Sequence, residues 1–447
     1  MRRHRSLRWL VVGGGLLAIV LFGTWLRVTA VAETRVLRPF GPDAWQYFHY
    51  AVNLVRSGVY SKDPSPQTGV PPRPDAFRSP GYPLFLVPFA ATTMDPSLIL
   101  DRVVTAQAWI SGVAIVLLFG IARCVLPTAL ALLAALLTAV TPHLITMNHY
   151  LLSESWYTFL LLAALLAMGW GRPWWSWLLV GMFLGMAGLV RPILLPFVGC
   201  MALGIAWHKD FPERRNKVLA LVFGFCLLVF PWALRNKIVL GTFGDDTLAI
   251  HTTAHGMYPD LLYNGDPQTF AYPYHFDPRF PEITTNAASV LREITNRFFR
   301  EPGRYLKWYL LDKPQWFWSW NIIQGQGDAF VYPTTHSPFF WHPVFQMLHR
   351  LLFALHPLLV VLAGLGSLVV WLPRTFSPSG QWPSLFMARS IALLLGSMTV
   401  LHMVFIPLSR YSIPLRPMIY VMSLFFLWWV YHNLRRWLQP GPILKKV

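Results

Sequence analysis

Long apolar segments recur along the whole chain and alternate with polar junctions. About ten of them are long enough, or nearly so, to cross a bilayer as a helix, which needs about 20 mainly apolar residues. They cover approximately residues 9–31, 103–122, 128–147, 155–170, 174–189, 193–207, 218–234, 351–372, 386–406 and 413–432. The pattern predicts an all-α polytopic membrane protein, one domain over residues 1–447 with about 10–12 transmembrane helices.

Basic residues gather at alternate junctions between these segments. They occur in RRHRSLR at the start, at Arg123, Arg172 and Arg374, in residues 208–217, and in the tail after residue 432. By the positive-inside rule these junctions face the cytoplasm, so the protein is expected in the cytoplasmic (inner) membrane. The first apolar segment lacks a clear cleavage site, and we expect it to be retained as a span.

Two long polar segments, residues 32–102 and 235–350, then share the external or periplasmic face. The first begins with an amphipathic helix over residues 42–58, with Gly58 as its C-terminal cap. The apolar run at residues 82–94 is too short to span and predicts an interfacial or re-entrant piece. The second loop shows helical spacing at residues 283–301 and 302–313. The run WFWSW at residues 316–320 predicts an aromatic belt at headgroup depth.

Composition agrees with the membrane class, because 55% of the residues are apolar and only 13% are charged, with a mean hydropathy of +0.45. The formal charge of +18 comes without a basic soluble domain, which argues against nucleic acid and favours topology and contact with anionic lipid or phosphate. Cys124, Cys200 and Cys226 lie in or beside apolar runs without a CxxC, so we expect neither disulfides nor a thiolate metal site.

A lone acid, Asp43, opens the amphipathic helix in a chain that is poor in acids. One interpretation is structural: Asp43 is the N-cap, and Gln46 three residues later completes a capping box. The other is functional, because several isolated ionisable residues lie at the same predicted external ends. They are Glu154, Arg78, Arg191, Arg235 and Arg410. Carboxylates and guanidinium groups that meet at a membrane surface suit a phosphorylated lipid substrate.

The run PDAWQYFHYAVNLVRSGVY, followed by RSPGYPLFLVPF, resembles the first external loop of GT-C glycosyltransferases. The branch it resembles includes protein mannosyltransferases, the bacterial transferases that add aminoarabinose to lipid A, and proteins similar to rhizobial lipopolysaccharide galacturonosyltransferases. Further matches follow in the family's order and cover most of the chain: TPHLITMNHYLLSESWYTFLLLAALLA, GLVRPILLPF, PWALRNKIVLGTFG and SRYSIPLRPMIYV. Where many relatives have a GxNLYxGN-like stretch, this chain has HTTAHGMYPDLLYNGD, which leaves the acceptor and sugar specificity open.

The resemblance implies a catalytic aspartate at Asp43 and a bundle fold with two external loops. It also implies transfer of a sugar from a polyprenyl phosphate carrier to a lipid, glycan or protein hydroxyl on the external side. Such a transfer needs a base for the acceptor proton and cations for the departing phosphate. Asp43 is the candidate base, although a helix N-terminus lowers the basicity of a carboxylate there.

The remaining candidates each have a structural alternative. Arg78 is the leading phosphate-binding cation because of its motif, and Arg191, Arg235 and Arg410 follow; an arginine at the end of a span also commonly reaches lipid headgroups. Glu154 is either catalytic or simply solvated at the start of a span. Candidates for substrate contact are Tyr47, His149, Tyr82 and Tyr411.

The segment HTTAH places His251 and His255 four residues apart, with two aspartates nearby. This spacing matches a metal site on one helix face, but a match of two histidines is weak, and Gly256 and the threonines favour a loop. Arginine and aspartate suffice for the chemistry, so we expect no cofactor, with a divalent metal left as an alternative.

A secondary transporter or a flippase of lipid-linked substrates is the main non-enzyme alternative, and a non-catalytic lipid-binding or assembly protein is the third. Transporters place ionisable groups and broken helices near the middle of the membrane in repeated halves. Here the ionisable groups lie at the predicted external ends, and the two halves do not match. These features favour the enzyme.

Overall fold

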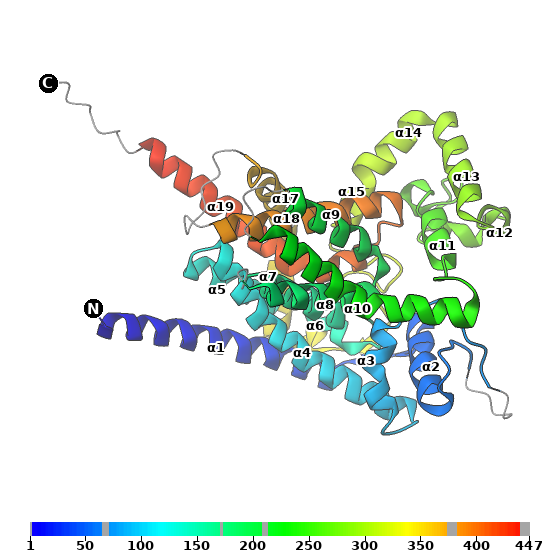
Figure 1. Ribbon diagram of the computed structural model, residues 1–447, viewed down its shortest axis with the longest axis horizontal. Coiled ribbons are helices and arrows are strands. Elements are labelled where there is room, and N and C mark those ends of the chain that lie inside the picture. The colour runs from blue at the N-terminus through cyan, green and yellow to red at the C-terminus, as the bar shows by residue number, and fades with distance from the viewer. Residues whose placement is uncertain (1, 65–70, 170–172, 208–212, 373–381, 439–447) are drawn as a thin grey trace.

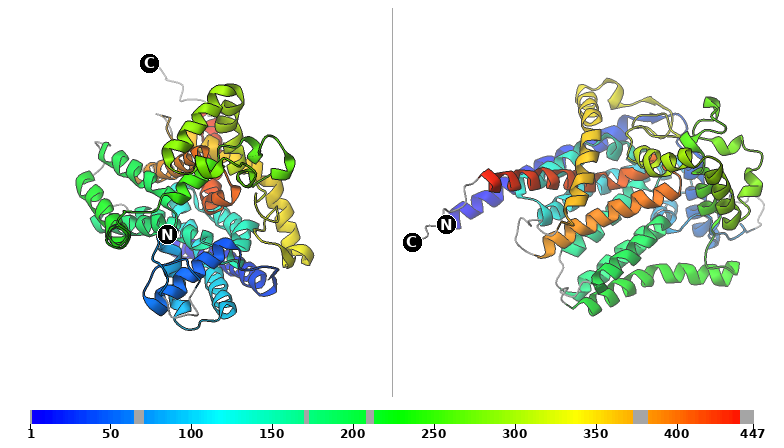
Figure 2. Two further views of the ribbon diagram at one scale, coloured as in Figure 1. Left: turned by 90° about the vertical axis from the view of Figure 1, so that its right-hand side faces the viewer. Right: turned by 90° about the horizontal axis from the view of Figure 1, so that it is seen from above.

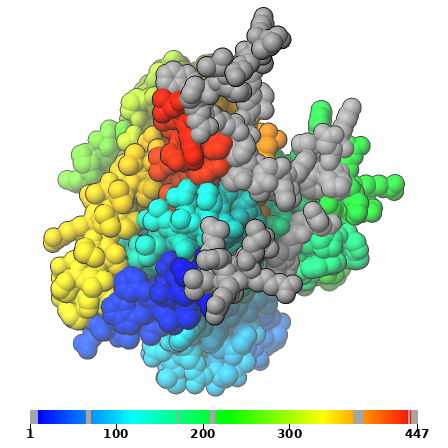
Figure 3. Space-filling model, turned by 90° about the vertical axis from the view of Figure 1, so that its left-hand side faces the viewer, coloured from blue at the N-terminus to red at the C-terminus, as the bar shows by residue number. Residues whose placement is uncertain are grey.

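The computed structural model describes residues 2–64, 71–169, 173–207, 213–372 and 382–438. Its helices form an elongated bundle, and the short helices of the two long loops gather at one end (Figure 1). Helix α1 (Arg2–Glu33) begins at the opposite end, and α19 (Arg416–Leu438) finishes there. Figure 3 views that opposite end, where described parts of α1 (blue) and α19 (red) reach the surface of the same face.

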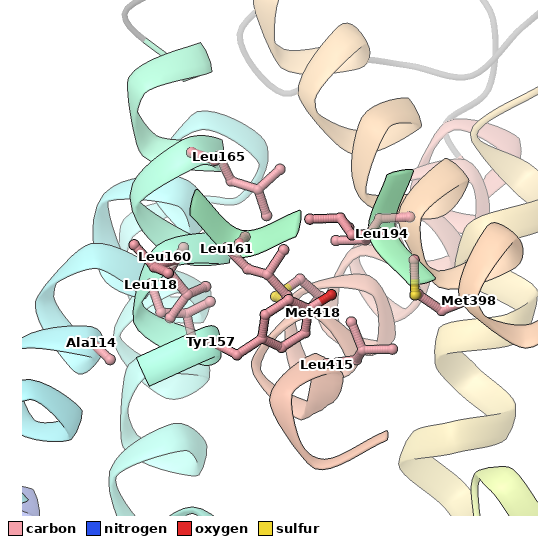
Figure 4. Close-up of a cluster of buried hydrophobic side chains, with 14 of the residues drawn as sticks. Ala114, Leu118, Tyr157, Leu160, Leu161, Leu165, Leu194, Met398, Leu415 and Met418 are labelled. Atoms are coloured by element: carbon pink, nitrogen blue, oxygen red, sulfur yellow. The ribbon is translucent and has the colours of Figure 1, made fainter. Parts of the chain in front are cut away.

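The bundle contains, besides α1 and α19, the following helices: α4 (Pro96–Val125), α5 (Thr128–Val140), α7 (Glu154–Gly169), α8 (Trp174–Val190), α9 (Leu195–Trp207), α10 (Arg214–Leu240), α17 (Pro343–Val369) and α18 (Trp382–Val404). Helix α7 packs against α4 and α8, and α8 lies along α10. Figure 4 shows α7 side chains such as Tyr157 and Leu161 beside Leu415 and Met418. The centre of the apolar core therefore lies around α7.

Within the described residues, 6 helices are long and apolar enough to cross a membrane, and a bent pair makes a seventh. Each of the ten predicted spans coincides with a helix or with this pair. Three of the ten, α7, α8 and residues Pro192–Trp207, are apolar but shorter than a full span. The all-α bundle is confirmed, whereas the count of ten spans is not. Parts of the basic junctions lie outside the described residues, namely Arg172, Arg374, residues 208–212 and the tail after 438.

The bent pair joins α5 to α6 (Pro142–Thr146) and the short helix Met147–His149, with a bend of 54°. Pro142 explains the break, because proline disfavours helical geometry in the residue before it. The break leaves carbonyl groups at the end of α5 without helical partners. Arg27 of α1, fully buried, donates hydrogen bonds to the carbonyl oxygens of Ala139 (2.7 Å) and Thr138 (3.1 Å). A buried arginine thus caps the broken span.

The segment after the break leads to Glu154 and is buried along its whole length, from Thr141 to Ser155. The sequence predicted a short external junction here, with Glu154 as a solvated acid in the structural alternative. That alternative is wrong, because Glu154 is only 1% exposed. The chain turns inside the protein because the bent pair stops short of the surface formed by the two loops.

The first loop holds α2 (Pro42–Ser57) and α3 (Gly81–Ala90). The second holds α11 (Thr247–His255), α12 (Phe280–Ile283), α13 (Ala287–Arg300), α14 (Pro302–Lys307), the π-helix Trp308–Asp312, α15 (Lys313–Phe317) and α16 (Pro338–Trp341). Strands β1 (Arg35–Val36) and β2 (Thr334–His336) pair antiparallel, so the two loops are joined by a small sheet. The predicted helices at 42–58, 283–301 and 302–313 are present. The right-hand view of Figure 2 shows the loop helices clustered at one end of the bundle.

The aromatic segment 316–320 packs partly into the protein, and its place at headgroup depth stays a prediction. Phe317 and Trp320 are buried, and the indole of Trp318 donates to the hydroxyl of Thr399 (3.1 Å) in α18. Just before this segment, the buried Lys313 donates to the carbonyl oxygens of Met403 (2.8 Å), Val404 and Phe405 at the end of α18. A cation at the C-terminus of a helix satisfies its last carbonyl groups. The second loop is therefore fastened onto the bundle.

Candidate functional site

Asp43 lies in the first turn of α2 but does not cap it. The N-cap is Gly41 and Pro42 is the first helical residue, with no side-chain capping hydrogen bond. The predicted capping box is therefore wrong, because proline at the first position starts the helix earlier than expected. Gln46 instead accepts a hydrogen bond from Nε of Arg78 (2.7 Å). At the other end, Gly58 has φ 68° and caps the helix as predicted.

Five of the predicted charged residues join in one chain of ion pairs, which we call the ion network. Nη2 of Arg78 lies 2.6 Å from Oδ1 of Asp43, and Nη1 of Arg410 lies 3.4 Å from Oδ2. Nε of Arg410 also lies 2.5 Å from Oε1 of Glu154. Nη2 of Arg191 reaches the same Oε1 at 2.8 Å. The order Arg78, Asp43, Arg410, Glu154, Arg191 alternates positive and negative charges.

Each member of the ion network comes from a different part of the chain. Asp43 belongs to α2 and Glu154 is the first residue of α7. Arg191 is the C-cap of α8, and Arg410 lies in the 3₁₀ segment Ser409–Leu415. Arg78 precedes α3, where the hydroxyl of Tyr60 donates to its carbonyl oxygen (2.9 Å). The site therefore exists only when the first loop and three separate parts of the bundle are assembled.

Gly81 allows two of these segments to approach each other. A Cβ atom there would lie 2.6 Å from the backbone of Leu189 and of Val190, at the end of α8. Only glycine fits so close an approach of two backbones. The contact brings the start of α3, with Arg78 just before it, next to Arg191. The close approach of α3 to the end of α8 therefore requires the glycine of the RSPGYP motif.

The two carboxylates of the ion network differ in exposure, and we call the side of Asp43 its open end. The side chain of Glu154 is 1% exposed and that of Asp43 is 35% exposed. Three guanidinium groups and two carboxylates leave one net positive charge. Nη1 of Arg78 and Nη2 of Arg410 have no hydrogen-bond partner among the described residues. Positive charge and free N–H donors therefore remain near Asp43.

Asp43 is held as an anion. Burial raises the pKa of its carboxyl group, but the charges and hydrogen bonds of Arg78 and Arg410 lower the pKa by more, so that it lies below its ordinary value. The carboxylate is consequently ionised at neutral pH. It is also a weak base as long as both arginines stay paired with it.

Three predicted tyrosines lie at or behind the ion network. The ring of Tyr47 lies beneath the guanidinium of Arg78, at 5.4 Å, and packs edge-on against Tyr82. Tyr411 stacks against Arg191 at 5.2 Å. Tyr82 is fully buried, and its hydroxyl donates to Gln107 (2.8 Å). Tyr47 and Tyr411 thus line the site, while Tyr82 supports it from behind.

Arg235 and His149 are not members of the ion network. Arg235 donates to the carbonyl oxygens of Asp75 (2.8 Å) and Tyr60 (3.2 Å) and stacks on Trp232. It therefore holds the segment that precedes Arg78. His149 is buried, and neither of its ring nitrogens has a hydrogen-bond partner within the described parts of the chain.

The candidate metal residues His251 and His255 lie on helix α11, so the expected loop is wrong. His251 is exposed, whereas His255 is buried with Nε2 3.1 Å from the carbonyl oxygen of Ala271. In the part of the chain that the structure describes, no three His, Cys, Asp or Glu side chains form a group suited to a metal ion. The two histidines thus lack the further ligands that a metal centre needs.

Two residues near the site were missed or misread from the sequence. The sequence singles out Gln46 as part of a capping box and not as the partner of Arg78. Tyr332, from the second loop, has a buried hydroxyl without a hydrogen-bond partner among the residues that the structure describes. Burial raises the pKa of this hydroxyl. The charge of Arg410 lowers the pKa and that of Asp43 raises it, so both residues lie close to Tyr332. No local pattern around Tyr332 marks it, because its proximity to Asp43 arises from the packing of one loop on the other.

Comparisons with known proteins show a likeness of fold. No family model and no curated protein matches the sequence. The structure matches oligosaccharyltransferase AglB from Archaeoglobus fulgidus in complex with an inhibitory peptide and a dolichol-phosphate, with 14% identity, a TM-score of 0.51, and coverage of 97% of this chain and 52% of that chain. The apo form of the archaeal enzyme matches with 14% identity, a TM-score of 0.52, and coverage of 95% and 51%.

The chain has the GT-C fold. It spans about half the length of the archaeal oligosaccharyltransferase. ArnT from Cupriavidus metallidurans bound to undecaprenyl phosphate also matches, with 14% identity, a TM-score of 0.42, and coverage of 94% of this chain and 77% of that chain. Helix α2, which carries Asp43, lies at the end of the bundle where the short helices of the two long loops gather (Figure 1).

Glu154→Gln should lower the stability of the protein substantially. The change leaves the guanidinium groups of Arg191 and Arg410 without their shared carboxylate, and loss of one partner of a buried ion pair costs about 3–5 kcal/mol. Thermal unfolding in detergent measures the effect. Glu301→Gln is the matched control, because its pair with Arg304 is exposed and contributes little. Equal unfolding temperatures for both variants would contradict the structural importance of Glu154.

Proposed function

We propose that this protein is a membrane glycosyltransferase that transfers a sugar from a polyprenyl-phosphate-linked donor to an acceptor hydroxyl, with Asp43 as the base. The observation that carries the proposal is the carboxylate of Asp43, held between Arg78 and Arg410 at the open end of the ion network. The GT-C fold supports it, since AglB was solved in complex with a dolichol-phosphate. The acceptor is a lipid, a glycan or a protein.

The charge of the ion network favours a monophosphate donor. The network carries one net positive charge, and a sugar joined to a lipid through one phosphate carries one negative charge. The free N–H groups of Arg78 and Arg410 are suited to its oxygen atoms, because guanidinium groups bind phosphate through paired hydrogen bonds. A diphosphate donor would bring excess negative charge beside Asp43 and Glu154.

In the proposed reaction, the acceptor hydroxyl oxygen forms a bond to the anomeric carbon of the donor sugar. The bond between that carbon and the phosphate oxygen breaks, and its electron pair leaves with the polyprenyl phosphate. Asp43 accepts the hydroxyl proton. The phosphate gains negative charge as it leaves, and Arg78 and Arg410 stabilise that charge in a partly water-excluded site.

Phosphate binding also increases the basicity of Asp43, which is weak in the free protein. In the free protein, both arginines lower the pKa of the carboxyl group. Once a phosphate shares these arginines, part of their positive charge is neutralised and the basicity of Asp43 rises. The donor thereby prepares the base for the acceptor. Glu154, which touches Arg191 and Arg410, acts in this proposal as a positioning residue.

We propose further that the ion network faces the exterior or periplasm of the cytoplasmic membrane. It lies on the side of the two long loops, and the short basic junctions such as RRHRSLR alternate to the other side.

Asp43→Asn should lower sugar transfer by about 10²–10⁴-fold, the usual contribution of a positioned base. Donor affinity should stay equal or increase, because the change removes a negative charge next to the phosphate site. Transfer of radiolabelled sugar from polyprenyl phosphate in proteoliposomes measures the rate. Asp101→Asn, at an exposed acid of α4, is the control. Undiminished transfer by Asp43→Asn at equal protein level would remove Asp43 from catalysis.

Arg78→Ala should weaken donor binding by about 10–100-fold, because a charge-assisted hydrogen bond contributes about 1.5–3 kcal/mol. Binding of a fluorescent polyprenyl phosphate sugar to the purified protein measures the affinity. Arg73→Ala provides the comparison, since Arg73 is exposed in the same loop. Unchanged donor affinity in Arg78→Ala would assign the phosphate to another site.

The orientation can be tested with a cysteine at Ala288, an exposed position of α13 in the second loop. The native Cys124, Cys200 and Cys226 are replaced first, because all three are free. An impermeant maleimide should label Ala288→Cys in intact spheroplasts. Labelling restricted to inverted membrane vesicles would place the ion network on the cytoplasmic side.

A further inference from the structure

A cavity of about 800 Å³ adjoins the ion network and is formed entirely by the second loop. Its walls are residues 270–272 and 315–327, apart from positions 317 and 318. Asn321, in the wall, accepts a hydrogen bond through its carbonyl oxygen from Ser409 (2.6 Å), the residue before Arg410. Burial, and then the charge of Asp43, raise the pKa of the wall residue Tyr272. The cavity therefore lies next to the proposed base.

The lining of the cavity is aromatic and polar but uncharged. Four rings line it, and four side-chain amides and one hydroxyl accompany them. The rings are Phe270, Tyr272, Trp316 and Trp320, and the polar groups are Gln315, Asn321, Gln324, Gln326 and Ser319. None of these described lining residues is Lys, Arg, His, Asp or Glu. A charged ligand would lose its hydration here without gaining an ionic partner.

Several of the amides have unused hydrogen-bonding capacity. The side chains of Gln315 and Asn321 are exposed and have no hydrogen-bond partner among the described residues. Gln324 uses its NH₂ group on the carbonyl oxygen of Ala271 (2.6 Å), which leaves its own oxygen free. Gln326 uses its oxygen on the backbone N–H of Thr334 (2.8 Å), which leaves its NH₂ group free. The wall therefore offers both free hydrogen-bond donors and free hydrogen-bond acceptors.

The backbone of the cavity wall adopts costly conformations at two non-glycine residues. Ala271 has φ 68° and Gln324 has φ 64°, and the hydrogen bond between them joins the two sides of the wall. Side chains rarely adopt such left-handed conformations, and those that do cluster at ligand sites. Both residues line the cavity, so the two left-handed conformations lie in its wall.

We propose that this cavity binds an uncharged oligosaccharide. Aromatic rings stack on the apolar faces of sugar rings, and side-chain amides match their hydroxyl groups, which donate and accept at once. The volume falls within the range of about 300–1,000 Å³ of pockets for small organic ligands, which accommodates roughly two or three sugar rings. Binding of the oligosaccharide stands on the cavity alone, whereas its assignment as the acceptor of the sugar rests on the proposed function.

The test uses the full-length protein in lipid nanodiscs on an array of immobilised oligosaccharides. The array carries neutral di- and trisaccharides beside uronic-acid-containing and phosphorylated ones of the same length. Binding should be confined to neutral glycans. Preference for the charged glycans, or binding to no neutral glycan, would overturn the proposal.

Variants then locate the binding. Trp316→Ala should weaken affinity for the best neutral glycan by about tenfold or more, through loss of stacking area. Gln315→Ala and Asn321→Ala should each weaken it about threefold to tenfold, and both positions are exposed, so folding is preserved. Trp207→Ala and Asn296→Ala, at exposed positions outside the cavity, are the matched controls. Equal affinity in the cavity variants and the controls would overturn the site.

A competition experiment separates an acceptor glycan from the sugar of the donor. Polyprenyl phosphate sugar should leave binding of the neutral glycan unchanged when the cavity holds the acceptor. Displacement of the glycan by the donor would overturn the acceptor assignment. It would show that the cavity binds the sugar of the donor. If the unmodified protein transfers no sugar from polyprenyl phosphate in proteoliposomes while the glycan still binds, the proposed function fails and the cavity proposal stands.

Discussion

The arrangement of this protein's charged residues depends on the carboxylate of Glu154, which pairs through one oxygen atom with both Arg191 and Arg410. Two guanidinium groups at this depth would repel each other and lose hydration without a shared anion. With Glu154 between them, Arg410 can extend to Asp43, and Arg78 closes the other side of that carboxylate. Two of the three arginines thus flank Asp43, where the proposed phosphate would bind.

Other charged side chains inside the bundle obey the same constraint with different partners. Arg27 is fully buried and is held by carbonyl groups at the break after α5, and Lys313 is held by carbonyl groups at the end of α18. In both cases the helix terminus supplies partial negative charge where no carboxylate is present. These contacts fix the broken span and the second loop, and through them the positions of Glu154 and of the cavity wall.

The ion network and the cavity are complementary in chemistry. The network offers charge and few apolar surfaces, whereas the cavity offers rings and amides without charge. A lipid-linked sugar phosphate and a neutral glycan would therefore occupy different surroundings and meet near Asp43. The separation allows the protein to hold an anion strongly without holding the second substrate by the same groups.

Hydrophobic periodicity along the chain determined the helical bundle, the two long loops and the helix that begins near Asp43, because burial in lipid or protein requires apolar runs of a definite length. The motifs also singled out Asp43, Arg78, Arg191, Glu154 and Arg410. Local pattern failed where packing overrides it: Gln46 bonds Arg78 rather than a helix end, and Glu154 is buried rather than solvated. Only the tertiary structure decided which arginines reach Asp43, whereas Arg235 binds a backbone carbonyl group instead. The cavity lined by Tyr272 also arises only in the tertiary structure. The physical reason is that ion pairs and cavities depend on distances of a few ångströms between segments far apart in the chain, which periodicity does not encode.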